Sequence, residues 1–319
     1  MANIKDIARL SGYSVATVSR YINKNGYVST KAAQAIQRVV EKVDYVPNTI
    51  ARDLSTGRTK TIGVVVPFFE YSYFSQLFAS ITKAAFNAGY SVIALKTNYD
   101  TELERQYLEQ LHQKRYDGLI FTSHTVSLET MLSYQKYGPI VCCRNLGDVP
   151  LAATYSVRNK TYDDVFELAK KGNFQGIALT LNRDYDHSPT TQAAVDCYEQ
   201  VFHQKPKPEY MVTGVLGYED GYQAAEYFLS LPTPPDFIFA NSDNIAAGIF
   251  QYYRNQRQSM PTIVGQENEV VSRLMNISTI DHHYDEVGKN AVDLVINKKV
   301  QHIPVASEFI RRTGQLSFI

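Results

Sequence analysis

The chain has 319 residues, of which 44% are hydrophobic and 20% charged, so a disordered polypeptide and a single small core are both excluded. The formal net charge is zero, but residues 1–60 hold ten basic and four acidic side chains, a net charge of +6 that the remainder balances. A basic head on an acidic body is expected where only the head meets phosphate.

Several classes of protein are disfavoured by what the chain does not contain. No run approaches the roughly 18 apolar residues that span a membrane, and charged residues interrupt the N-terminus, so we expect no secretion signal and no membrane partner. Three cysteines form an odd set without metal-ligand spacing, and we interpret Cys142, Cys143 and Cys197 as small core residues. We therefore expect a cytoplasmic protein without metal or cofactor.

The first 45 residues predict three short helices. Each is preceded by a residue suited to cap it: Asn3, Ser14 and Ser29. The second is expected over Val15 to about Ile22, after an interruption at Gly12. Apolar residues recur at helical spacing and predict one small core, made of Ile4, Ile7, Ala8, Val18, Ile36, Val39, Val40 and Val43.

The segment IKDIARLSGYSVATVSRYIN, residues 4–23, is typical of a helix-turn-helix. Its second helix opens with small and hydroxyl residues, which let the backbone approach the major groove of DNA. Arg20 can bond the O6 and N7 atoms of guanine. Four further side chains can hydrogen-bond phosphates and fix the register, namely Ser14, Thr17, Ser19 and Asn23.

A short helical segment is expected at residues 49–55, between Pro47-Asn48 and Thr56-Gly57. Asn48 is a good N-cap, and the apolar residues are Ile50, Ala51 and Leu54. So short an element cannot bury all three by itself. We therefore interpret the segment as a hinge that needs a partner.

From Ile62 onwards, short apolar strands alternate with helical stretches. The strands are IGVVV, SVIAL, GLIFT, PIVCC, GIALT, FIFA and IVG, separated by helices such as 74–86, 102–114, 128–137, 192–202 and 244–253. This alternation predicts doubly wound parallel sheets. There are too many strands for one compact sheet, so we expect two α/β lobes with a break near residues 156–160 and a cleft between their facing strand ends.

Candidate ligand residues follow the predicted strands. The aromatic run PFFEYSYF, residues 67–74, suits stacking on a sugar or base and includes Tyr73 and Phe74. Polar candidates at later strand ends are Arg144, Asn241, Ser242, Asp243, Glu267 and His282. A structural or capping role stays open for each of them.

The head segment, together with YVPNTIARDLSTGRTKTIGVVVP, resembles the N-terminus of LacI/GalR repressors. Weaker landmarks continue to the end of the chain, including DGLI at 117–120, ANSDNIAAG at 240–248, VGQEN at 264–268 and STID at 278–281. The resemblance implies a homodimeric repressor that binds a pseudo-palindromic, double-stranded operator and is released by a small effector. It also implies that the two lobes have the fold of periplasmic binding proteins.

The resemblance implies three domains and several residue roles. The domains are a helix-turn-helix domain at 1–46, a hinge and linker at 47–59, and a ligand-binding and dimerisation domain at 60–319. Lobe 1 would comprise 60–157 plus 282–301, and lobe 2 would comprise 158–281 plus 302–319. Val15 and Ala16 would select operator bases by apolar contact, and Leu54 would enter the minor groove, with Asn48 and Ala51 beside it. Tyr73 and Phe74 would contact the ligand.

Two departures from the family pattern bear on the effector. Ala194 stands where many relatives carry an arginine, for which Arg183 and Asp184 could substitute, and residues 157–164 read VRNKTYDD. Glu267 stands where relatives usually carry aspartate. The middle of the chain resembles regulators of maltose and maltodextrin use, which favours a sugar inducer.

Three alternatives were weighed against this interpretation. Asp281-His282-His283 could suggest catalysis, but adjacent histidines on a strand point to opposite faces and chelate poorly, so we expect no enzyme. A free-standing sugar-binding protein would have an export signal and no basic head. A regulator of the same family that is constitutive, or controlled by a protein partner or a co-repressor, remains open.

Overall fold

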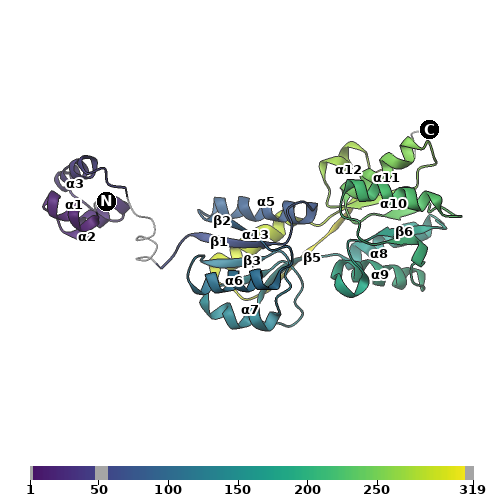
Figure 1. The fold of residues 1–319 in the computed structure, drawn as a ribbon, viewed down its shortest axis with the longest axis horizontal. Helices are drawn as coiled ribbons and strands as arrows, with labels where there is room; N and C mark the ends of the chain where they lie inside the picture. The colour runs from purple at the N-terminus through teal and green to yellow at the C-terminus, as the bar shows by residue number, and fades with distance from the viewer. Residues whose placement is uncertain (1–2, 47–56, 313–319) are drawn as a thin grey trace. The chain divides into compact units, whose positions relative to one another are not determined.

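The computed structural model describes residues 3–46 and 57–312, drawn in colour in Figure 1. The chain divides into two compact units, Met1–Thr59 and Lys60–Ile319, and each is described here by itself. The predicted hinge residues Asn48, Ala51 and Leu54 lie outside the described residues. No helix in the described ranges is long and apolar enough to cross a membrane.

The first unit contains the three predicted helices. They are α1 (Ile4–Ser11), α2 (Val15–Asn23) and α3 (Thr30–Lys42). The predicted caps are confirmed, because the side chains of Asn3, Ser14 and Ser29 accept hydrogen bonds from the first turns. Gly12 ends α1 with φ of 75°, a left-handed conformation that glycine adopts without steric cost.

The core of the first unit is small and apolar. Ile7, Val18 and Ile36, one from each helix, are completely buried, and partly buried side chains from all three helices pack around them. Complete burial of such a side chain contributes about 1.5–3 kcal/mol. This core fixes which faces of the helices remain at the surface.

The first lobe of the second unit is built on a six-stranded parallel sheet. Its order is β11-β5-β4-β3-β1-β2. The strands are β1 (Thr61–Val66), β2 (Ser91–Lys96), β3 (Gly118–Phe121), β4 (Ile140–Cys142), β5 (Ala152–Val157) and β11 (His302–Ala306). Helices α5 (Ser72–Asn87) and α13 (Tyr284–Asn297) share one core cluster, and α6 (Thr101–His112) and α7 (Leu128–Tyr134) share the other.

The second lobe repeats this plan, as Figure 1 shows. Its sheet has the order β12-β10-β9-β8-β6-β7, with only β12 antiparallel. The strands are β6 (Ile177–Thr180), β7 (Met211–Val212), β8 (Phe237–Phe239), β9 (Thr262–Gln266), β10 (Ser278–Asp281) and β12 (Glu308–Ile310). The helices are α8 (Asn159–Lys171), α9 (Pro189–Phe202), α10 (Tyr218–Ser230), α11 (Asp243–Asn255) and α12 (Val270–Leu274).

Helices α10 and α11 approach each other closely because glycines line their contact. A Cβ atom on Gly248 would lie 2.1 Å from the backbone oxygen of Tyr218, and one on Gly221 would lie 2.4 Å from that of Ile245. Any larger residue at either position would force these helices apart.

The prediction of two doubly wound lobes is confirmed, but one boundary is wrong. We expected residues 302–319 in lobe 2, whereas β11 pairs in parallel with β5 of lobe 1, with His302 opposite Ala153. Strand β11 forms the edge of the first sheet, and β12 joins the second sheet. The last crossing from lobe 1 to lobe 2 therefore follows Ala306.

Candidate functional site

The surface of α2 carries the residues expected to read bases. Val15 is 43% exposed and Ala16 and Arg20 are also exposed, whereas Val18 is completely buried. A core role for Val15 is therefore excluded. The aliphatic part of Arg20 lies next to Gly26, which leaves its guanidinium at the surface.

The hydroxyl and amide residues of α2 are tied to their own helix. The Ser14 hydroxyl accepts from the Thr17 backbone N–H at 3.2 Å and lies 2.9 Å from the Thr17 hydroxyl. Asn23 donates to the Ser19 hydroxyl at 3.2 Å. These bonds orient the side chains without using all their polar atoms. Tyr27, which the sequence analysis did not single out, is 88% exposed just beyond α2.

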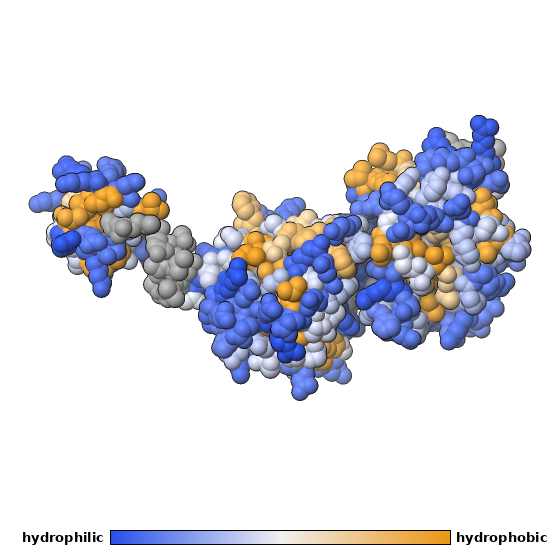
Figure 2. Space-filling view, in the orientation of Figure 1, coloured by the Kyte–Doolittle hydropathy of each residue, from blue (hydrophilic) through white to orange (hydrophobic). Residues whose placement is uncertain are grey.

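In the second unit, polar and aromatic side chains gather where strands of both lobes end. We call this set the interlobe site. It comprises Tyr73, Tyr99, His124, Arg144, Arg158, Arg183, Glu267, His282 and Tyr284. In parallel α/β folds this edge of the sheet is where ligands bind. In Figure 2 the surface narrows where the two lobes meet.

Tyr73 lies in the interlobe site as expected. Its hydroxyl donates towards the backbone oxygens of Thr122 at 3.1 Å and Cys143 at 3.4 Å, and its ring centroid is 5.1 Å from that of Tyr284. Burial raises the pKa of Tyr73 far above its usual range, so the phenol stays protonated. Phe74 does not share this position. It is 4% exposed and packs in the core of lobe 1, which corrects our expectation of a ligand contact.

Two predicted ligand residues form hydrogen bonds within lobe 2 instead. Asn241 accepts from the Thr180 hydroxyl at 2.7 Å and donates to the Val215 oxygen at 2.9 Å. Ser242 caps α11 by accepting from the Ile245 N–H at 3.2 Å. In this structure both residues serve as connectors between elements of lobe 2.

Asp243 is completely buried, and both of its carboxylate oxygens are occupied. One accepts from the Thr279 hydroxyl at 2.6 Å and the other from the Glu269 N–H at 2.7 Å. Burial raises the pKa of Asp243 to about 6. Because this carboxylate is completely buried and held by donors of lobe 2, our expectation of a ligand contact is corrected to a structural role.

Glu267 reaches the interlobe site from the end of β9. It is 8% exposed, its φ of 94° is unusual for a residue other than glycine, and its Oε2 atom has no partner among the described residues. Burial raises the pKa of Glu267 well above its usual range, while Ser72 and Arg158 lower it by less. Burial therefore favours the protonated carboxyl group, which can donate as well as accept.

His282 joins the two lobes at their boundary. Its Nε2 lies 3.0 Å from Oε1 of Gln266 in lobe 2, and its Nδ1 lies 3.3 Å from the Ser156 hydroxyl in lobe 1. Because the amide oxygen can only accept, Nε2 carries the proton and Nδ1 accepts from serine. Burial lowers the pKa of His282 well below its usual range, so the ring is neutral.

Arginines that the sequence analysis did not assign, or assigned only as substitutes, also reach this boundary. Arg158 donates to the Tyr284 hydroxyl at 3.2 Å from the crossover after β5. Arg183 of lobe 2 places its guanidinium carbon 5.0 Å from the ring centroid of Tyr99 in lobe 1. The signal for Arg158 was its place in the unusual VRNKTYDD stretch, directly after a strand that the apolar pattern did not reveal.

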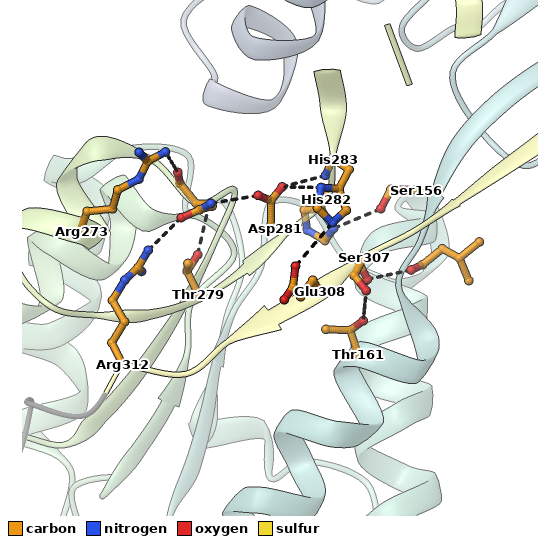
Figure 3. A network of polar contacts seen from close by, with 12 residues as sticks. Ser156, Thr161, Arg273, Thr279, Asp281, His282, His283, Ser307, Glu308 and Arg312 are labelled. Carbon is orange, nitrogen blue, oxygen red and sulfur yellow. Dashed lines mark hydrogen bonds and ion pairs between the residues drawn. The ribbon is translucent and has the colours of Figure 1, made fainter. Parts of the chain in front are cut away.

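A polar network surrounds the crossovers between the lobes (Figure 3). Asn268 is its centre, because its amide donates to Asp281 at 2.9 Å and accepts from Arg312 at 2.8 Å, while its backbone oxygen accepts from Arg273 at 3.1 Å. Beside it, the Ser307 hydroxyl lies 2.6 Å from that of Thr161. The Asn268 bonds connect β10 to the segment beyond β12, and the Ser307 contact connects the crossover between β11 and β12 to α8.

Both units match known protein families. Residues 3–48 match the family model described as bacterial regulatory proteins, lacI family, and residues 59–313 match the model described as periplasmic binding proteins and sugar binding domain of LacI family. The chain is 35% identical over 312 residues to catabolite control protein B of Bacillus subtilis (strain 168), covering 98% of this chain and 100% of that one.

More distant relatives match over similar lengths. The ribose operon repressor of Escherichia coli (strain K12) is 28% identical and covers 94% of each chain, and the sucrose operon repressor of Streptococcus mutans is 27% identical and covers 99% of this chain and 98% of its own. A crystal structure of the lac repressor dimer bound to operator and the anti-inducer ONPF superposes with a TM-score of 0.83 at 19% identity, with 99% of each chain covered. At that identity the superposition shows the shared fold.

Proposed function

We propose, from the premise that this chain belongs to the LacI family of bacterial regulatory proteins, that it represses a carbohydrate-utilisation operon and leaves its operator when a sugar-type effector binds. The helix-turn-helix head binds DNA, and the two lobes bind the effector. The relatives named as ribose and sucrose operon repressors, which align over almost the whole chain, support the sugar class.

The exposed surface of α2 is the observation that supports the DNA-binding part of the proposal. Val15, Ala16 and Arg20 are exposed on one helix whose opposite face is locked in the core by Val18. An exposed arginine on a recognition helix can form two hydrogen bonds with guanine, and small apolar residues permit close approach to a thymine methyl. The α2 surface therefore has both elements of direct readout.

Release requires that the effector prefer one arrangement of the lobes. Three chain crossings connect the lobes, after Val157, Asp281 and Ala306, and the residues around them are joined by polar side chains rather than by a continuous sheet. A ligand that contacts both lobes favours the arrangement in which both contacts are made. Coupling of about 1–3 kcal/mol would change operator affinity roughly 5–150-fold.

The repressor is proposed to act as a homodimer on a pseudo-palindromic operator. A single head buries too little surface for tight binding, whereas two heads bind symmetric half-sites. Figure 2 shows apolar side chains gathered over α12, where Leu274 is 81% and Val270 is 64% exposed. Large exposed aliphatic side chains on a short helix mark a protein contact, and we assign it to the second copy. The solved lac repressor relative is itself described as a dimer on its operator.

An operator titration tests the proposal. The full-length protein is titrated against labelled operator in the presence of a panel of mono- and disaccharides and their phosphates. We expect at least one compound to weaken operator binding by 5-fold or more, and operator DNA to weaken binding of that compound equally, as linkage requires. If no compound moves the curve, control by a protein partner or a co-repressor replaces this proposal.

A further inference from the structure

The interlobe site is rich in guanidinium groups that have few partners. Arg144 follows β4, Arg158 follows β5 and Arg183 follows β6, and each is partly buried. Within residues 3–46 and 57–312, the Arg144 side chain makes no hydrogen bond or ion pair, the Arg158 side chain makes one hydrogen bond to Tyr284, and the Arg183 guanidinium contacts the ring of Tyr99. Each guanidinium has five N–H donors, so most remain available.

These arginines share one electrostatic neighbourhood. Arg144 and Arg158 both lower the pKa of Tyr73, against the larger effect of burial, and Arg183 lies over Tyr99, which also influences Tyr73. Arg144 further contributes to lowering the pKa of His124 to about 4, where burial is the main cause. Arg144 and Arg158 therefore lie near Tyr73, while Arg183 of lobe 2 lies over the neighbouring Tyr99.

Among the described residues, no carboxylate forms an ion pair or hydrogen bond with any of these three guanidinium groups. Glu267 is a carboxyl group close enough to Arg158 to be affected by it, but burial raises its pKa well above the usual range and so disfavours its charged form. Asp184, beside Arg183, is exposed and bonded to His187, and His187 lowers the pKa of Asp184 more than Arg183 does. Two buried polar atoms of the interlobe site also lack partners among the described residues, Nε2 of His124 and Oε2 of Glu267. Partly buried charges without partners are costly, so a ligand is expected to complete the site.

We propose that the effector is an anion, specifically a sugar bearing a phosphate monoester, with the phosphate held by Arg144, Arg158 and Arg183. A guanidinium offers paired N–H groups that match phosphate oxygens, and a phosphate monoester has enough oxygens to bond more than one arginine at once. Phe68, Tyr71 and Tyr99 form a contiguous aromatic cluster at the same edge, with centroids 5.1 and 5.5 Å apart, which provides ring faces for the sugar.

This assignment rests on the proposed function, and it explains physically how an effector would change the arrangement of the lobes. Arg144 and Arg158 come from lobe 1 and its crossover, while Arg183 comes from lobe 2. A phosphate between them joins the lobes, whereas without it the three like charges repel one another. The ligand therefore has the differential affinity that population shift requires.

The test compares sugars with their own phosphates. Full-length wild-type protein is mixed with glucose, glucose 6-phosphate, fructose, fructose 6-phosphate, sucrose, sucrose 6-phosphate or inorganic phosphate, and binding is measured by calorimetry and by operator release. At least one sugar phosphate should bind tenfold or more tightly than its neutral parent. Arg144→Gln and Arg183→Gln should each weaken that binding tenfold or more, with little change for the neutral sugar.

Matched controls are Arg105→Gln in lobe 1 and Arg254→Gln in lobe 2, both exposed and outside the interlobe site. They should bind as wild type, and circular dichroism should show that all four variants are folded. If a neutral sugar releases the operator and its phosphate binds no better, this inference is wrong while the proposed function stands. If inorganic phosphate binds as tightly as every sugar phosphate, the sugar is not recognised and the inference also fails. If nothing releases the operator, both fail.

Discussion

At the scale of single residues, burial separates side chains that are free to act from those that hold the fold. Arg20 and Asp243 were both assigned to function from sequence position, but Arg20 is exposed and Asp243 is completely enclosed. An exposed guanidinium gives up only water when it binds DNA. An enclosed carboxylate would have to break two short hydrogen bonds to reach a ligand.

Replacing Arg20 with alanine should weaken operator binding by about 1–3 kcal/mol and relax selection at one guanine in each half-site, because a bidentate contact to that base is lost. Selection from a randomised operator library measures both effects. Arg105→Ala, which removes an exposed arginine from the body, is the control and should change neither. Retained selection at every guanine would show that Arg20 contacts only phosphate.

Replacing Asp243 with alanine should destabilise lobe 2, because the Thr279 hydroxyl and the Glu269 N–H lose their acceptor. The pKa of Asp243 is about 6 in the folded protein and 3.8 in a model peptide, so the folded state binds the extra proton between these values. The contribution of Asp243 to the free energy of unfolding is therefore fully present below pH 3.8, the model-peptide pKa, and is lost as the pH rises through about 6, the pKa in the folded protein.

Asp243→Ala should therefore lower the free energy of unfolding by about 1 kcal/mol more at pH 5 than at pH 7.5. Urea unfolding at the two pH values measures it. Asp293→Ala, on an exposed position of α13, should show no such difference. If Asp243→Ala is as stable as wild type at both pH values, the carboxylate is not the connector that the structure indicates.

At the scale of elements, the two units differ in architecture. The head consists of three capped helices around a few fully buried aliphatic side chains, so each helix presents one free face. The lobes are layered, with helices on both faces of each parallel sheet and polar side chains left at the strand ends. Between these units the chain carries the proposed hinge at 47–59, whose apolar residues we assign to DNA.

Leu54→Ala should weaken binding to the operator more than binding to random DNA. A leucine wedged between base steps stabilises only the kinked, specific complex, whereas nonspecific binding depends mainly on phosphate contacts. Parallel titrations of both DNAs give the two affinities. Leu10→Ala removes a leucine that is 55% exposed elsewhere on the head and should leave the ratio unchanged. An equal loss on both DNAs for Leu54→Ala would contradict a minor-groove role.

At the scale of the whole molecule, the proposed regulation requires that two heads and the lobes that control them be linked in one assembly. In our proposal the interlobe site couples the effector to the arrangement of the lobes, and the dimer places two heads on one operator. The exposed aliphatic side chains of α12 are the described feature that we assign to assembly. Neither function can be performed by one unit alone.

Leu274→Asp should therefore convert the dimer to a monomer and remove operator protection at the same protein concentration, since a charge would be placed in an apolar contact. Sedimentation gives the mass, and footprinting should show two inverted half-sites for wild type. Val300→Asp is the matched control, because Val300 is 56% exposed on the other lobe. A dimer that persists in Leu274→Asp would place the interface elsewhere, and protection of one asymmetric half-site by wild type would contradict the dimeric mode.

Local sequence was sufficient for the head and for most of the strand and helix pattern. Capping residues and helical spacing act within a few positions, so α1, α2 and α3 could be predicted closely, as could β1 to β4 with the helices between them. Strand β5 and the pairing of β11 with it were missed, because AATYSV and HIPVA have little local signal and become strands by pairing, β5 between β4 and β11 and β11 at the edge of the sheet.

The site was decided by tertiary contacts. His282 meets Ser156, a residue 126 positions away, and Arg183 meets Tyr99 across the lobe boundary. Phe74 lies in the first turn of α5 and Asp243 begins α11, positions at which ligand residues are expected. In the folded protein, however, Phe74 packs in the core of lobe 1 and Asp243 is completely buried. Strand ends identify which residues can reach a site, whereas burial and the occupation of each donor and acceptor depend on distant segments that only the folded chain brings together.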